Sequence, residues 1–133
     1  MPGRVMIFDD DNDLLEVCSI VLKSKNYTVS ALSKCNDIVE EVKAFSPNVI
    51  LMDNWIPDVG GVKATQLLKN NLELKSIPVV FFSANERIRE LAMEAGADFY
   101  LQKPFELEEL EAVVSKGITI HRKAVIKDAG YPA

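Results

Sequence analysis

Residues 5–11 read Val5-Met6-Ile7-Phe8-Asp9-Asp10-Asp11, in which four apolar residues are followed at once by three acidic ones. A continuous apolar run of this length is typical of a strand buried on both faces, and the acidic residues mark the point where the chain returns to solvent. Apolar residues then recur at helical spacing from Asn12 onward, at Leu14, Leu15, Cys18, Val21 and Leu22. The opening of the chain therefore predicts a buried strand followed by an amphipathic helix.

The same alternation of strand and helix repeats along the rest of the chain. Further strands are expected at 27–32, 49–52, 79–82 and 99–101, and further helices at 38–45, 62–68, 88–95 and from 106 onward. Parallel neighbours need crossover connections, so alternating strands and helices predict an α/β fold with a doubly wound, five-stranded parallel sheet. The apolar residues after Gly117 have no clear period, which leaves either an extension of the last helix or the start of a linker.

Length and composition describe one compact acidic domain. The 133 residues carry 15 Lys plus Arg against 20 Asp plus Glu, a net charge of −5, and 48% of them are hydrophobic. We expect a single domain over 1–133, with its core at about 4–117 and residues 118–133 as a helix extension or tail. Direct nucleic acid binding is not expected, because affinity for phosphates depends on Lys and Arg.

The chain lacks the sequence signals of a membrane or secreted protein. Its longest apolar run is far shorter than a membrane span, and its N-terminus lacks the pattern of a signal peptide. We therefore expect a cytoplasmic protein without membrane contact, in which Cys18 and Cys35 are reduced thiols.

Polar residues follow the expected strands where each strand leaves the sheet. Asp9 and Asp10 follow the first strand, and Asp53 follows the third. Ser83 follows the fourth strand, and Lys103 follows the fifth. Ligands of an open parallel sheet bind beyond the carboxyl ends of its strands, so we expect these side chains to meet at one edge.

A divalent metal suits this expected cluster. Neighbouring carboxylates repel and raise one another's pKa unless a cation neutralises them. Mg²⁺ binds one or two carboxylates and keeps its other positions for water and substrate oxygens, and Mn²⁺ is the alternative ion. We expect Asp10 and Asp53 to hold the ion together with a backbone carbonyl. Ser83 and Lys103 are then available to hold phosphoryl oxygens, as phosphoryl transfer requires.

Five short motifs carry a resemblance to a signalling family. In chain order they are Phe8-Asp9-Asp10-Asp11, Leu51-Met52-Asp53-Asn54-Trp55-Ile56-Pro57 before Gly60-Gly61, Phe82-Ser83-Ala84, Ala95-Gly96-Ala97-Asp98 and Lys103-Pro104-Phe105. With these motifs in order at the strand ends, the chain resembles a receiver domain of the two-component response regulators, similar to the single-domain chemotaxis regulator and the receivers of hybrid kinases. The resemblance implies a flavodoxin-like α/β/α sandwich with strand order 2-1-3-4-5.

The resemblance also implies how the site works. Asp53 would be the phosphoacceptor, taking a phosphoryl group from a phosphohistidine of a sensor histidine kinase or a histidine phosphotransfer protein. Asp10 would bind Mg²⁺ directly, Asp9 through water, and Trp55 through its main-chain carbonyl. Lys103 would bond the phosphoryl group. Such a domain is not an enzyme with a metabolic substrate, because it catalyses only its own phosphorylation and dephosphorylation.

Four further roles follow from the resemblance alone. Ser83 would be the switch hydroxyl, and Tyr100 the aromatic that turns inward with it. The peptide bond before Pro104 would be cis. Trp55 and Asn85 would tune the lifetime of the phosphoryl group.

The expected output surface lies around the fourth helix, the fifth strand and the fifth helix. Its charged residues are Arg87, Arg89, Glu90 and Glu94. This mixture of charges beside apolar residues suits a transient partner, whose identity the sequence leaves open, or a homodimer formed on phosphorylation.

Some of these residues also have plain structural interpretations. Asp11 is expected only to cap the first helix. Ser83 could cap the next helix, with Glu86 completing a capping box. Tyr100 could be a core aromatic, because strand aromatics usually pack. His121 is expected to be exposed and without a partner.

Two other functions compete with the receiver. The first is a small Mg²⁺-dependent phosphohydrolase with an aspartyl-phosphate intermediate, but such enzymes usually carry a second acid two residues after the nucleophile, where this chain has Trp55. The second is a pseudo-receiver that acts only by protein contacts. It would normally have lost Asp10, Asp53 or Lys103, and all three are present.

Overall fold

The computed structural model describes residues 2–128. Its strands are β1 (Arg4–Phe8), β2 (Thr28–Leu32), β3 (Val49–Asp53), β4 (Val79–Ser83) and β5 (Phe99–Gln102). Its helices are α1 (Asn12–Ser24), α2 (Ile38–Phe45), α3 (Gly61–Lys69), α4 (Ile88–Ala95) and α5 (Leu107–Asp128). The order of strands and helices is therefore the predicted one, with nearly the predicted bounds.

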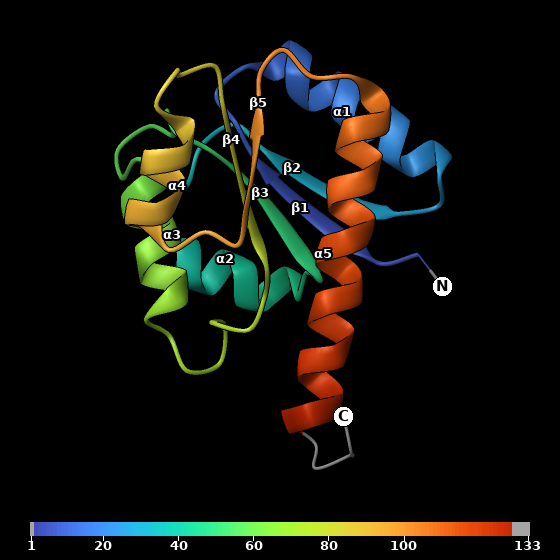
Figure 1. Cartoon of the computed structure of the whole chain (residues 1–133), viewed down its shortest axis with the longest axis vertical. Helices are drawn as coiled ribbons and strands as arrows, with labels where there is room; N and C mark the ends of the chain where they lie inside the picture. Colours follow the sequence, from blue (N-terminus) through green and yellow to red (C-terminus); the bar gives the residue numbers. More distant parts are fainter. Residues whose placement is uncertain (1, 129–133) are drawn as a thin grey trace.

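Within residues 2–128, the strands form one parallel sheet in the order β2-β1-β3-β4-β5. Figure 1 shows α1 and α5 on one face of this sheet and α2, α3 and α4 on the other. Each face has its own apolar core, one built against α1 and α5 and the other against α2 and α3, with a smaller cluster under α4. The prediction of a three-layer sandwich with order 2-1-3-4-5 is confirmed.

Burial explains why some strands read as continuous apolar runs. All residues of β3 and β4 are buried, and so are all residues of β1 after Arg4. These strands lie inside the sheet and are covered by helices on both faces, so both sets of side chains must be apolar. The edge strands β2 and β5 are partly exposed and accordingly carry polar residues.

The starts of α1 and α4 test the two predicted helix caps. Asp11 caps α1 as predicted, because its side chain accepts hydrogen bonds from the backbone N–H groups of Asp13 and Leu14. The prediction that Ser83 and Glu86 form a capping box is wrong, because α4 begins only at Ile88. Ser83 therefore lies at the end of β4, several residues before the helix.

The residues after Gly117 continue the last helix. Helix α5 runs without interruption to Asp128, and its second half extends past the sheet at the bottom of Figure 1. A Cβ at Gly117 would lie 2.8 Å from Cγ2 of Val49, so the glycine allows α5 to approach β3 closely. The linker alternative is wrong for 118–128, and residues 129–133 lie outside the described part of the chain.

The two cysteines are buried. Cys18, in α1, and Cys35, in the loop before α2, are both free thiols, as expected. Burial raises the pKa of Cys18 to about 11 and that of Cys35 to about 12, so both are protonated near neutral pH. Every helix among residues 2–128 is too short or too polar to cross a membrane.

The expectation that His121 is exposed and unpartnered is wrong. Its ring is half-buried, and Nδ1 lies 3.2 Å from Nδ2 of Asn48. The Oδ1 atom of Asn48 accepts the backbone N–H of Arg4, so its amide group donates to the imidazole. Burial lowers the pKa of His121, and the charges of Arg122 and Lys69 lower it further.

Candidate functional site

Three carboxylates meet at the carboxyl ends of β1 and β3. Oxygen atoms of Asp9, Asp10 and Asp53 all lie within 4.8 Å of one another. The strands β1 and β3 are neighbours, and their last pair in register is Phe8 and Met52, so the next residue on each chain is an aspartate. Asp9 and Asp53 are buried, whereas Asp10 is exposed. This set of oxygen ligands, open to solvent on the side of Asp10, fits a hard divalent cation.

The ammonium group of Lys103 joins the two buried carboxylates. Its Nζ atom donates to Oδ2 of Asp9 at 2.6 Å and to Oδ1 of Asp53 at 2.9 Å. The side chain of Lys103 is 20% exposed and those of Asp9 and Asp53 are almost fully buried. Lys103 follows β5, so it reaches across β4 to contact β3 and β1. The predicted lysine is therefore at the predicted edge of the sheet.

Burial and charge shift the ionisation of this group of side chains. Burial raises the pKa of Asp9, and the nearby charge of Asp53 adds to that, against the hydrogen bonds from Lys103 and from the backbone of Asp11. Burial opposes the charge of Lys103, but its hydrogen bonds to Asp9 and Asp53 outweigh that effect and raise its pKa. The lysine therefore stays charged, and the buried acids depend on it for neutralisation.

Backbone groups orient both buried carboxylates. Oδ1 of Asp9 accepts the N–H of Asp11 at 2.9 Å, and Oδ2 of Asp53 accepts the N–H of Trp55 at 2.9 Å. Each carboxylate thus has one oxygen held by the backbone and the other by Lys103. The arrangement leaves neither acid free to rotate away from the cluster.

Two glycines shape the loop after Asp53. Gly60 has φ of +79°, a conformation that side chains disfavour. Gly61 donates its N–H to the carbonyl of Asn54, and a Cβ at Gly61 would overlap the carbonyl oxygen of Asp53. The start of α3 therefore packs directly on the backbone of the central aspartate, which ties its position to the helix.

The other residues that the sequence predicted for the site differ in burial and contacts. Ser83 is 2% exposed, and its hydroxyl accepts the N–H of Asn85 at 3.1 Å. Tyr100 is 49% exposed, so its interpretation as a core aromatic is wrong. Trp55 is 71% exposed and, with Asp10, lines a groove of about 480 Å³ along residues 54–60. The peptide bond between Lys103 and Pro104 is cis.

Sequence reasoning missed two contacts at this site. It assigned Asp9 only to the metal, whereas the structure pairs it directly with Lys103. It also missed the ring of Phe82, whose centroid lies 4.6 Å from Nζ of Lys103. An aromatic residue immediately before Ser83 was the available signal, but the continuous apolar run of β4 explains Phe82 equally well as a core residue.

Comparison with known proteins identifies the family of this fold and site. The family model described as "Response regulator receiver domain" matches residues 5–115. The chain belongs to the response regulator receiver domains. It is therefore a domain of two-component signalling, a family whose members generally act as signalling modules rather than as enzymes.

Relatives of this receiver domain include whole regulators. It is 28% identical over 116 residues to the DNA-binding response regulator MtrA of Mycobacterium leprae and to that of Mycobacterium tuberculosis. The match covers 86% of this chain and 50% of each relative, so the chain spans about half the length of the curated relatives it matches.

Solved structures of receivers have the same fold. A response regulator from Chloroflexus aurantiacus superposes with a TM-score of 0.83 at 24% identity, over 90% of this chain and 99% of that one. The receiver domain of the sensor histidine kinase PA1611 from Pseudomonas aeruginosa has a TM-score of 0.76 at 25% identity, with the same coverage. That protein was solved with a magnesium ion coordinated in its active site cleft.

Proposed function

We propose that this receiver domain accepts a phosphoryl group on Asp53 from a phosphohistidine of a sensor histidine kinase or a histidine phosphotransfer protein. The observation that supports this most is the convergence of Asp53 with Asp9, Asp10 and Lys103 at one sheet edge. A carboxylate oxygen of Asp53 attacks phosphorus, the bond from phosphorus to the imidazole nitrogen breaks, and the imidazole leaves with its electron pair and takes up a proton. The domain thereby catalyses only its own modification.

We propose Mg²⁺ as the cofactor, with Mn²⁺ as a substitute. Asp10, Asp53 and the main-chain carbonyl of Trp55 would hold the ion directly, and Asp9 would act through water. The ion would neutralise charge on the phosphoryl oxygens during transfer. The exposure of Asp10 and the close spacing of the acidic oxygens support this set of ligands.

The remaining side chains act on the transferred group. Lys103 would exchange one of its carboxylate contacts for a phosphoryl oxygen, and it is already charged and aimed at Asp53. The hydroxyl of Ser83 would bond another phosphoryl oxygen. Trp55 and Asn85 flank the approach of water, so they would set how long the phosphoryl group survives.

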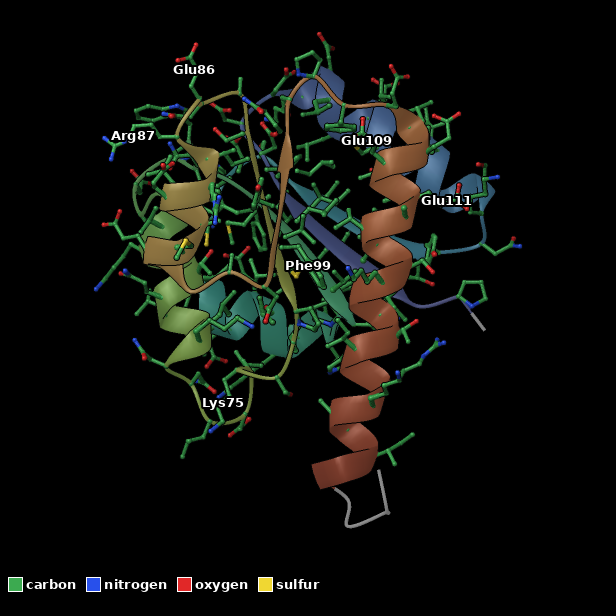
Figure 2. The ribbon with its side chains drawn as sticks, viewed as in Figure 1. Lys75, Glu86, Arg87, Phe99, Glu109 and Glu111 are labelled. Atoms are coloured by element: carbon green, nitrogen blue, oxygen red, sulfur yellow. The ribbon has the colours of Figure 1, made fainter. Side chains whose placement is uncertain are left out.

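Phosphorylation would then change a distant surface. If Ser83 moves toward the phosphoryl group, the exposed ring of Tyr100 gains space to turn inward. The affected surface includes α4 and the residues just before it, with the exposed charges Arg87, Arg89, Glu90 and Glu94. Arg87 points away from the fold in Figure 2. We propose this surface as the site for an output partner or for a homodimer formed on phosphorylation.

Mass spectrometry after incubation with acetyl phosphate and Mg²⁺ tests the acceptor. We expect one added phosphoryl group on the wild type and none on the Asp53→Ala variant. Asp58→Asn is the matched control, because Asp58 is an exposed acid in the same loop and its positive φ suits asparagine. Equal labelling of the wild type and Asp53→Ala would contradict the assignment.

The two competing functions have less support. A phosphohydrolase of this kind would need an acid where the chain has Trp55, a residue that is itself exposed. A pseudo-receiver would not need Asp10, Asp53 and Lys103 together, and all three lie at the same edge. We propose a cytoplasmic location, since its partner kinases present their phosphohistidines there.

A further inference from the structure

The ring of Phe82 lies against the ammonium group of Lys103. Nζ of Lys103 is 4.6 Å from the ring centroid, within the range of a cation–π contact. Phe82 is fully buried and occupies the last position of β4 before Ser83. It is thus a rigid aromatic surface directly beneath a charged side chain of the site.

The sheet order explains why this contact forms. Lys103 starts beyond β5 and reaches Asp53 on β3, so its side chain must pass over β4, which lies between them. In register, Phe82 is paired with Asp53 on one side and with Leu101 on the other. Parallel partners in register point to the same face, so the Phe82 ring lies under the path from Lys103 to Asp53.

The chemistry of the ring suits this position. The ammonium group has carboxylate oxygens from Asp9 and Asp53 as hydrogen-bond acceptors, and it is largely removed from water. The negative face of an aromatic ring attracts a cation that has lost part of its hydration. A leucine in the same place would fill space but would offer no such attraction. During phosphoryl transfer, the ring would keep the ammonium in place while its carboxylate contacts change.

We propose that Phe82 is a positioning residue that holds the Lys103 ammonium beside Asp53 for phosphoryl transfer. This inference rests on the proposed function and deepens it by assigning a residue beyond the predicted site. Phe82 touches none of the reacting atoms and acts only through Lys103. Its contribution comes from the ring's charge distribution, which separates it from ordinary core packing.

Fluorinated phenylalanines at position 82 test the proposal, because fluorine weakens the negative ring face while largely preserving ring shape. We expect the rate of phosphorylation by acetyl phosphate to fall stepwise with fluorine content, to about threefold to tenfold below wild type. The unfolding midpoint in urea should stay near that of the wild type. Phe81 is the matched control, because it is equally buried but belongs to the apolar cluster beneath α4.

A second measurement is independent of phosphorylation. The ring should shift the NMR signals of the Lys103 side-chain protons upfield, and Phe82→Leu should remove that shift. The proposal is overturned if the rate is insensitive to fluorination of Phe82, or if fluorination of Phe81 slows it equally. If the wild type is not phosphorylated at all, the proposed function fails. The contact itself is then supported if the upfield shift is present and lost in Phe82→Leu, and overturned if it is absent.

Discussion

The pairing of Lys103 with two buried acids makes this lysine a determinant of stability as well as of chemistry. Replacing Lys103 by methionine keeps most of the side-chain volume but removes the ammonium. Asp9 and Asp53 then remain buried at the same edge without their cation. We therefore expect Lys103→Met to destabilise the domain strongly in metal-free buffer near neutral pH.

The geometry gives the size of the effect. With contacts of 2.6 Å and 2.9 Å, each carboxylate attracts the ammonium by about 6 kcal/mol at an effective dielectric constant of about 20, before dehydration is subtracted. Dehydration of each ion costs several kcal/mol, and removing one partner of a buried ion pair typically destabilises by about 3 to 5 kcal/mol. We expect a loss of about 3 kcal/mol, toward the lower end of that range, because Asp9 can take up a proton.

Urea unfolding at about pH 7.5 measures this loss, because carboxylates are ordinarily ionised at that pH. Adding Asp9→Asn to Lys103→Met should restore most of the stability, since only one buried carboxylate then remains. Saturating Mg²⁺ should also restore it. Lys75→Met is the control, because Lys75 is exposed and points into solvent in Figure 2, so its free energy of unfolding should change by less than about 0.5 kcal/mol.

Acid should reduce the defect. Burial raises the pKa of Asp9 above its ordinary value of 3.8, and losing Lys103 raises it further. A carboxyl whose folded pKa exceeds its unfolded pKa loses stability as pH rises from about the unfolded value through the folded one. Lys103→Met should therefore approach wild-type stability as pH falls toward 4. The reasoning would be refuted if Lys103→Met lowered the free energy of unfolding by less than about 1 kcal/mol and if pH, Mg²⁺ and Asp9→Asn did not change that loss.

Three further predictions concern the loops and α5. Gly61→Ala should cost about 2 to 3 kcal/mol in urea melts, since its Cβ would overlap the Asp53 carbonyl, and an unchanged melt would contradict this packing argument. Gly60→Ala should cost about 1 to 3 kcal/mol through backbone strain alone, because Gly60 has φ 79° and ψ 150° and a Cβ there would meet no neighbour. Asp11→Ala should lower the free energy of unfolding by about 1 kcal/mol through loss of the α1 cap, and an unchanged melt would show the cap to be dispensable. Burial holds the folded pKa of His121 below its ordinary value of 6.5. The free energy of unfolding should therefore keep the full contribution of this residue above pH 6.5 and should fall as the pH drops below it. His121 is the only histidine in the sequence, so a His121→Gln variant that kept this pH dependence would exclude the ring as its source.

Local sequence was enough to predict the succession of strands and helices and the parallel sheet, whereas the strand order came only from the family resemblance. Strands buried on both faces must be apolar throughout, so 5–8, 49–52 and 79–82 could be recognised without knowing their neighbours. The alternation with helices then required a parallel sheet, and a parallel sheet delivers its strand ends to one edge. For the same reason the sequence predicted that Asp9, Asp10, Asp53 and Lys103 would gather there. Asp11 was also readable, because a helix cap depends only on residues next to it.

Contacts between distant residues were decided by the tertiary structure. Local periodicity says which residues are buried but not what lies across the sheet from them. The pairing of Asp9 with Lys103 and the ring of Phe82 beneath that lysine both depend on β4 lying between β3 and β5. Tyr100 lies on the edge strand β5 and points to the opposite face from the buried Leu101, where its ring stays half exposed.

The second half of α5 shows the same limit. Its apolar residues lack a clean period because this part of the helix extends beyond the sheet, so that Ile120, Val125 and Ile126 are partly exposed. The half-buried His121 contacts Asn48, which is far away in sequence. A helical period of apolar residues indicates a helix that packs one face against a continuous apolar surface such as a sheet. The sequence therefore determined which helices cover the sheet, whereas only the tertiary structure decided what the end of α5 contacts.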